Sequence, residues 1–280
     1  MTGSGVDLHV HSNASDGSLA PRDVVRRAFE RGLHAIALTD HDTLEGLAEA
    51  RREGERRGLR VVAGCEFSVA VDWGEMHLLG YFLPAESEDL KRFLDDQRAK
   101  RLERARTMVW RLNERGLAVK EEEVLAQAGG GAVGRPHVAR ALVARGDVPD
   151  VGPAFDRHIG FGRPAFVPKE LPTVEQVTAL VRACGGVTSA AHLRERATAR
   201  ALRSLVGQGV DGVEVVHPSH DDETTARIGR LALEHRMVPT GGSDWHGADD
   251  SPRERDIGSL HVPLRWLHGM EKLHEERAAT

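Results

Sequence analysis

Residues 6–42, VDLHVHSNASDGSLAPRDVVRRAFERGLHAIALTDHD, contain a short apolar strand, an amphipathic helix and a second apolar strand. Val6–Val10 is predicted to form the first strand, and Pro21 stands where a proline favours the beginning of a helix. Gly32 ends that helix, and His34–Thr39 is predicted to form the next strand. This strand–helix–strand unit indicates an α/β fold.

The same alternation returns along most of the chain. Further strands are predicted at 60–65, 76–83, 186–191, 210–216 and 237–240, with helices at 44–57, 174–184, 195–206 and 222–236. Such apolar strands, separated by helices, predict a parallel sheet covered on both faces, and their number favours a barrel over an open sheet. From about Leu90 the pattern becomes helical. We therefore expect a barrel from residues 1–89 and 170–280, and a small, mainly helical insert from residues 90–169.

The composition limits the possible classes of protein. The chain has 280 residues and a net charge of -5, which argues against a grip on nucleic acid by the whole molecular surface. Its two cysteines, Cys65 and Cys184, stand in apolar runs without the spacing of a zinc site, so buried free thiols are expected. No stretch has the roughly 20 uncharged residues that cross a bilayer. We expect a cytoplasmic protein without a membrane association.

Histidines and carboxylates follow the predicted strands at their carboxyl ends. They are His9, His11, Asp16, His41, Glu66, His192, Glu214 or His217, Asp244 and His246. Because the carboxyl ends of parallel barrel strands share one face, these side chains should converge. The period of two along a strand also places His9 and His11 on the same side, as in a chelate. One such histidine is more often structural, but the whole set favours several metal ions, with manganese, iron and zinc all compatible.

Several motifs together resemble the polymerase and histidinol phosphatase (PHP) family, in particular its stand-alone bacterial phosphoesterases and the 3',5'-nucleotide bisphosphate phosphatase branch. The motifs are Asp7-Leu-His9-Val-His11-Ser12, Ser15-Asp16-Gly17, Thr39-Asp40-His41-Asp42, Gly64-Cys-Glu66, His77-Leu-Leu-Gly80, Ala191-His192 and Gly241-Gly242-Ser243-Asp244-Trp-His246-Gly247. They occur in order over nearly the whole chain. The resemblance implies a distorted seven-stranded (β/α)7 barrel and a site for three divalent metal ions, Mn²⁺, Fe²⁺ or Zn²⁺.

The resemblance also implies how the metal ligands are divided. One metal would be held by His9, His11, Glu66 and Asp244. Glu66 would bridge to a second metal, which His77 and His192 also bind. The third metal would be held by Asp16, His41 and His246. Every position carries the expected residue type, although relatives often have a proline where Leu193 follows the histidine.

Residues outside the metal set are candidates for substrate binding or catalysis. In Gly134-Arg135-Pro136-His137, the resemblance suggests that Arg135 reaches a substrate phosphate, for which a guanidinium is well suited; otherwise it is a solvent-exposed arginine at a helix start. Lys169, His217 and His220 are weaker candidates for a second phosphate or a general acid, against a surface role. Asp40 could act in catalysis or orient an imidazole.

The predicted insert contains a basic helix. Residues 91–116 carry nine basic side chains against four acidic ones. A solvated face with internal ion pairs is the favoured interpretation, and a surface that guides an RNA 5' end or a nucleotide is the sharper alternative. Aromatic residues make up 4% of the chain and offer few platforms for long single strands, so short substrates are favoured.

The leading functional hypothesis is hydrolysis of phosphomonoesters by a metal-bound hydroxide, with Arg135 orienting the phosphate. The family resemblance suggests nucleoside 3',5'-bisphosphates or the 5' ends of short RNA as substrates, which would make the protein a nucleotide phosphatase or an exoribonuclease. Two alternatives stay open: a phosphatase for a metabolite such as histidinol phosphate, and a non-catalytic metal-binding module. No obligate protein partner is expected.

Overall fold

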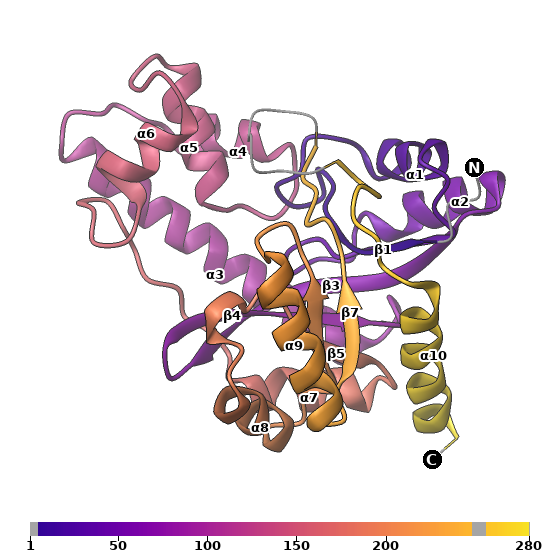
Figure 1. Cartoon of the computed structure of the whole chain (residues 1–280). Coiled ribbons are helices and arrows are strands. Elements are labelled where there is room, and N and C mark those ends of the chain that lie inside the picture. The colour runs from indigo at the N-terminus through magenta and orange to yellow at the C-terminus, as the bar shows by residue number, and fades with distance from the viewer. Residues whose placement is uncertain (1–4, 248–255, 280) are drawn as a thin grey trace.

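A sheet of seven strands, nearly closed into a barrel, forms the centre of the described chain, and its strands follow the order of the sequence (Figure 1). The computed structural model describes residues 5–247 and 256–279. The strands are β1 (Val6–Val10), β2 (Ala35–Leu38), β3 (Arg60–Val71), β4 (Gly74–Tyr81), β5 (Val187–Ala190), β6 (Gly212–Val216) and β7 (Val238–Gly241). The segment after β7 contacts β1 and the residue that follows it: the Asp244 amide donates to the His9 carbonyl at 2.8 Å, and the His11 amide donates to the Trp245 carbonyl at 2.9 Å. The predicted distorted seven-stranded barrel is confirmed.

One strand departs from the parallel arrangement that the sequence predicts. β4 pairs antiparallel with both β3 and β5, whereas the other neighbouring strands pair in parallel. The reason is the length of the connections: only Asp72 and Trp73 separate β3 from β4, and a parallel return needs a crossover of a dozen or more residues. β3 also continues to Val71, six residues beyond its predicted end, because it forms the first arm of this hairpin.

Helices cover the outside of the sheet. They are α1 (Pro21–Glu30), α2 (Leu47–Arg57), α7 (Val174–Ala183), α8 (Ala199–Gly207), α9 (Asp222–Glu234) and α10 (Leu264–Ala278). Local chemistry sets their limits. Pro21 stands in the first turn of α1, Thr173 caps α7 by accepting from the Gln176 amide at 3.2 Å, and Gly58 ends α2 in a left-handed conformation with φ of 71°. No described helix is both long and apolar enough to cross a membrane.

Between β4 and α7, the chain forms a group of helices on one side of the barrel (Figure 1). They are α3 (Glu88–Asn113), α4 (Glu121–Ala128), α5 (Arg135–Ala144), α6 (Val151–Ala154) and a π-helical turn (Phe155–Ile159). Met108 and Leu112 of α3 pack with Val138 and Leu142 of α5 in an apolar cluster separate from those of the barrel. These four side chains are at most 1% exposed. The helices therefore have a core of their own.

β1 shows how the barrel carries polar side chains inside. All five of its residues are buried. Val6, Leu8 and Val10 pack in apolar clusters, whereas Asp7 and His9 alternate with them and point to the other side. Buried histidines and carboxylates on the strands need partners. A buried polar group without a partner typically lowers the stability of the fold by about 1–3 kcal/mol.

Candidate metal centre and substrate cavity

Five imidazole rings surround the carboxylate of Glu66, which lies on β3 and is 1% exposed. Each ring has a nitrogen 2.7–3.3 Å from one of the two carboxylate oxygens; the rings belong to His9, His11, His41, His77 and His192. They come from β1, β4 and the segments after β1, β2 and β5. Residues up to 183 positions apart thus meet at one carboxylate.

Two further carboxylates extend this cluster. Asp244 Oδ1 lies 3.3 Å from Nε2 of both His9 and His11. Asp16 Oδ1 lies 3.3 Å from His246 Nε2, and Asp16 Oδ2 lies 3.8 Å from His41 Nε2. All nine residues proposed as metal ligands therefore lie in one contiguous group.

Three overlapping subsets of this group have ligand atoms within 4.8 Å of one another. They are His9, His11, Glu66 and Asp244; His11, Asp16, His41 and His246; and His41, Glu66 and His77. The first subset has the composition predicted for one metal, and the second contains the three residues predicted for another. In the third, His41 stands where His192 was expected, although His192 Nε2 lies 3.2 Å from Glu66 Oε1. The role of each residue as a ligand stays a prediction.

The buried donor atoms fit divalent metal ions. His9 Nε2, His11 Nε2 and Glu66 Oε2 are buried and make no hydrogen bond with any described residue. Imidazole nitrogens and carboxylate oxygens are the ligands that zinc, manganese and iron accept. Atoms that lie this close together without hydrogen bonds are explained by a cation between them, whereas a purely structural polar cluster would satisfy them.

The electrostatics of the cluster also require positive charge. Burial alone would raise the pKa of the Glu66 carboxyl, but His77, His41 and His9 hold this pKa well below its usual range. Burial, together with the charges of His11 and His77, lowers the pKa of His41 well below its usual range. Burial would also lower the pKa of His77, but the Glu66 carboxylate raises it to about 9. Protons or metal ions must therefore balance the buried carboxylates.

Several carboxylates hold the cluster in place. Glu214, on β6 and fully buried, accepts from His9 Nδ1 at 3.1 Å and from the His192 amide at 2.8 Å. Asp7 accepts from the backbone amides of Ser243 at 2.9 Å and Gly258 at 3.0 Å. A carboxylate that receives the second nitrogen of a ligand imidazole fixes its orientation. The sequence places Glu214 among the residues at strand ends, but only the structure reveals its contacts with His9 and His192.

Asp40 faces the loop that carries Asp16. It accepts from the Ser12 amide at 2.8 Å, from Ser12 Oγ at 2.7 Å and from Ser15 Oγ at 2.6 Å. These bonds use both of its oxygens. Asp40 therefore holds the segment of Ser12 and Ser15, and its function in orienting an imidazole or in catalysis stays a prediction.

Two histidines after β6 have different surroundings. His217 Nε2 lies 3.3 Å from Asp244 Oδ2, and His217 Nδ1 lies 2.7 Å from Ser219 Oγ. His220 Nδ1 lies 3.0 Å from the Val215 carbonyl, and His220 Nε2 accepts from the Arg194 amide at 3.3 Å. His217 thus belongs to the edge of the metal cluster, whereas both ring nitrogens of His220 anchor backbone segments.

Comparison with known proteins supports this description. The model of the PHP domain matches residues 7–127. A 5'-3' exoribonuclease of Haemophilus influenzae is 33% identical over 245 residues, which is 86% of this chain and 89% of that protein. The chain belongs to the PHP family. A 3',5'-nucleoside bisphosphate phosphatase of Chromobacterium violaceum is 32% identical over 261 residues, or 90% of each chain.

Solved structures agree with the sequence relatives. A protein of Bifidobacterium adolescentis, proposed to be a metal-dependent phosphoesterase, matches with a TM-score of 0.88 and 31% identity, over 96% of both chains. The PHP protein described here is thus a metal-dependent phosphoesterase, and the predicted hydrolase class is confirmed.

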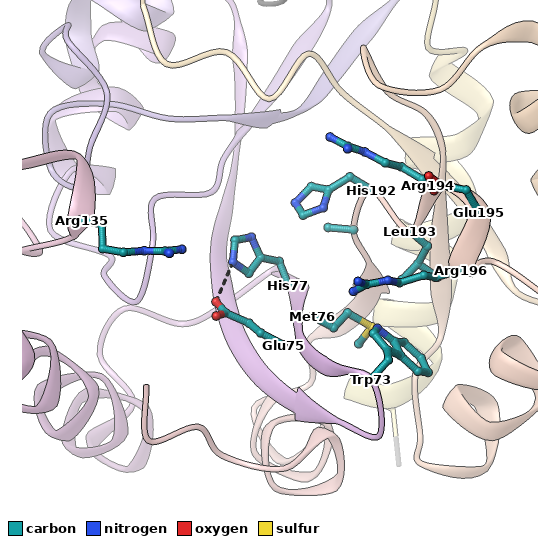
Figure 2. A pocket seen from close by; sticks show the side chains of 11 residues that line it. Trp73, Glu75, Met76, His77, Arg135, His192, Leu193, Arg194, Glu195 and Arg196 are labelled. Carbon is teal, nitrogen blue, oxygen red and sulfur yellow. Dashed lines mark hydrogen bonds and ion pairs between the residues drawn. The ribbon is translucent and has the colours of Figure 1, made fainter. Parts of the chain in front are cut away.

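The PHP protein has a cavity of about 380 Å³ beside the metal cluster (Figure 2). His77 and His192 belong both to its lining and to the cluster, so the cavity adjoins the cluster. Arg135 extends into the opening from α5, and its guanidinium lies 5.6 Å from the ring centroid of Phe155. Its binding of a substrate phosphate stays a prediction.

Lys169 lies beside this cavity rather than in its lining. Its ammonium donates to Ser68 Oγ at 2.9 Å and forms an ion pair with Glu75, whose Oε1 is 3.2 Å from His77 Nε2. The charge of Lys169 is therefore used within the protein, next to a candidate ligand.

The basic helix α3 divides its charges between two sides. Lys91, Arg92, Lys100 and Arg106 pair with acidic residues three or four positions away, as the solvated-face interpretation predicts. Arg101 instead points to the barrel, where it pairs with the buried Asp42 at 2.6 Å, and the Arg104 Nε donates to the Val167 carbonyl at 2.8 Å. The position of Asp42 beside His41 was the one sequence signal for this contact.

Proposed function

We propose that this PHP protein hydrolyses phosphomonoesters of nucleotides, either nucleoside 3',5'-bisphosphates or the 5' ends of short RNA. The observation that carries the proposal is that a cavity with arginine side chains adjoins a cluster of buried, unsatisfied atoms of the kind that bind metal ions. The activities named for the H. influenzae and C. violaceum relatives support the choice of substrates.

Nine residues would hold three divalent ions, Mn²⁺, Fe²⁺ or Zn²⁺: His9, His11, Asp16, His41, Glu66, His77, His192, Asp244 and His246. When bound, the ions would neutralise charge on the phosphoryl oxygens and lower the pKa of a water molecule. The unsatisfied buried atoms support the presence of ions at this position. Their number and identity belong to the proposal.

Residues of the chain would bind and orient the substrate around this centre. Arg135 would bind the phosphate, because its guanidinium reaches the cavity and no described carboxylate pairs with it. His217 would hold Asp244 in position through their 3.3 Å contact. Lys169 would keep Glu75 oriented toward His77. The buried position of Glu66 excludes bulk water from the centre, which strengthens each of these electrostatic interactions.

The helical insert would supply the substrate side of the site. We retain the division into a barrel of residues 1–89 and 170–280 and an insert of residues 90–169; residues 1–4, 248–255 and 280 of these ranges lie outside the described residues. The separate apolar cluster of α3 and α5 supports this division. A cytoplasmic location, independence of an obligate protein partner and the absence of membrane association stay predictions.

The test is phosphate release from a panel of substrates by the purified protein with added Mn²⁺. The panel contains adenosine 3',5'-bisphosphate, AMP, histidinol phosphate and a short 5'-phosphorylated RNA, and the control is His41→Ala. We expect preferential cleavage of the bisphosphate or the RNA, with loss of activity in the control. Preference for histidinol phosphate would contradict the nucleotide assignment, and no turnover of any substrate would favour a non-catalytic module.

A further inference from the structure

Two arginines stand across the substrate cavity from Arg135. Arg194 and Arg196 lie on the loop that follows β5, and both line the cavity with Trp73 and Met76 of the β3–β4 hairpin. Figure 2 shows the side chains of Arg194 and Arg196 extending from one side of the opening and that of Arg135 from the other. None of the three guanidinium groups forms an ion pair with a described carboxylate. The cavity therefore offers two arginines to an anion in addition to Arg135.

The backbone of the loop that carries these arginines is strained and is held in place by hydrogen bonds. Arg194 has φ of 52° and His192 has φ of 32°, a left-handed region that costs a residue with a side chain about 1–3 kcal/mol. The Arg194 amide donates to His220 Nε2 at 3.3 Å, and the Arg194 carbonyl accepts from Arg227 Nη2 at 2.9 Å. Both bonds hold the backbone of an exposed residue. A loop fixed in this way presents its side chains at a defined position, which supports a binding function.

The chemistry of the lining indicates what binds there. An arginine without a carboxylate partner matches a phosphate, whose oxygens accept two parallel hydrogen bonds from its guanidinium. Trp73, which is only partly buried, adds an aromatic ring of the kind on which a nucleobase packs. The lining also contains two carboxylates: Glu75 is paired with Lys169, and Glu195 alone offsets one of the three arginines.

We infer that Arg194 and Arg196 bind a second phosphate of the substrate, separated by a nucleoside from the phosphate at the metal cluster. The inference rests on the proposed function and deepens it, because it makes the protein selective for nucleotides with two phosphates over those with one. The same contacts would receive the first internucleotide phosphate of a short RNA whose 5' end is at the cluster.

Kinetics of the metal-loaded protein test the selectivity. The variant is Arg194→Ala/Arg196→Ala, and the matched control is Arg200→Ala/Arg203→Ala, which removes two exposed arginines of α8 outside the cavity lining. Because each lost charge-assisted hydrogen bond weakens binding about tenfold or more, the variant should raise KM for adenosine 3',5'-bisphosphate at least ~10-fold. Its kcat and its KM for AMP and adenosine 3'-phosphate should change little. An unchanged preference for the bisphosphate would overturn the inference.

A binding measurement separates this inference from the proposed function. Calorimetry in a His41→Ala background, which we expect to be impaired in hydrolysis, compares the affinity for adenosine 3',5'-bisphosphate with that for AMP. The bisphosphate should bind more tightly, and the two alanines should remove this difference. If the wild-type protein hydrolyses no nucleotide but the bisphosphate still binds more tightly than AMP, the proposed function is wrong and the inference of a second phosphate site is not. Equal affinity for both nucleotides would overturn the inference.

Discussion

At the scale of single residues, orientation matters as much as identity. His9 has one nitrogen 3.3 Å from Glu66 and the other 3.1 Å from Glu214. The first contact places it in the cluster, and the second sets the direction of its ring. Glu214 and the carboxylate of Asp40, which is held by Ser12 and Ser15, act on the centre from outside it.

The first prediction concerns Glu214. Glu214→Gln keeps the size of the side chain but removes the charge that orients His9 and His192. We expect the affinity for Mn²⁺ to fall about 10–100-fold, as is usual when a carboxylate behind a ligand imidazole is lost. Titration of the metal-free protein with Mn²⁺ measures it, with exposed Glu234→Gln as the control. Unchanged affinity for Mn²⁺ in a correctly folded variant would show that the charge of Glu214 is not needed for metal binding.

The second prediction concerns the pH dependence of stability through His137. Its Nδ1 accepts from the Gly134 amide at 2.9 Å, and burial, then the charge of Arg140, lowers its pKa to about 4. The unfolded chain takes up this proton near pH 6.5, so its contribution to stability is lost as pH falls from 6.5 toward 4. By pH 5 the loss should reach about 2 kcal/mol.

His137→Asn isolates the contribution of His137 to the pH dependence of stability, because the amide oxygen of asparagine can accept the same hydrogen bond without titrating. Thermal unfolding of both proteins without metal, between pH 7 and 5, should show the wild type losing more stability than the variant. Parallel curves would mean that His137 does not titrate differently on folding.

At the scale of elements, helix α3 connects the insert to the metal cluster. Arg101 of α3 is 11% exposed and pairs with Asp42, which has φ of 49° and follows His41 in the chain. The exposed ion pairs elsewhere on α3 contribute little to stability, because water and salt screen them. The buried pair differs, since removal of one partner leaves a buried charge uncompensated.

The third prediction follows from this contrast. Arg101→Gln should lower the free energy of unfolding by about 3 kcal/mol, because Asp42 then lies buried without its cation. It should also weaken metal binding by displacing the loop of His41. Exposed Arg106→Gln on the same helix should change stability by less than about 0.5 kcal/mol. Chemical denaturation measures both variants, and Arg101→Gln/Asp42→Asn should recover part of the loss. Equal effects of the two single changes would contradict the proposed connection.

Elements also show the limits of prediction from the sequence. That His9, His11 and Glu66 meet is predicted by strand periodicity and by the common face of strand ends. Both rules need only the position of each residue within its predicted strand. The contact of Arg101 with Asp42 joins residues 59 positions apart through tertiary packing, for which no local pattern exists. The antiparallel direction of β4 is not predicted for another reason: its apolar residues suit either direction, and the two-residue turn at Asp72 and Trp73 depends on the full length of β3, which extends past the predicted strand at 60–65. The left-handed Arg194 depends on the partners of its backbone, which a sequence does not reveal.

At the scale of the whole molecule, the barrel brings several buried carboxylates together and must balance their charge. Without metal, imidazolium groups supply the balance: the pKa of His77 is raised to about 9 by Glu66, and that of His246 to about 10 by Asp16, in both cases against the effect of burial. A histidine with a raised pKa stabilises the folded state below pH 6.5, and this contribution is lost as pH rises toward the folded pKa. The metal-free protein should therefore become less stable from pH 6.5 to 8.5.

The final prediction is that stabilisation by metal increases over the same range of pH. Metal ions bind neutral imidazoles, so their binding releases the protons that the metal-free cluster retains. A metal at 100 times its dissociation constant adds about 2.7 kcal/mol per independent site, and a higher pH lowers that constant. The melting temperature with Mn²⁺ minus that with EDTA should thus rise from pH 6.5 to 8.5, and elemental analysis should approach three ions per chain. In Asp244→Asn the difference should be smaller at every pH, because the first ligand subset loses a charge. A difference that stays constant or falls with pH would show that the buried histidines do not exchange protons for metal.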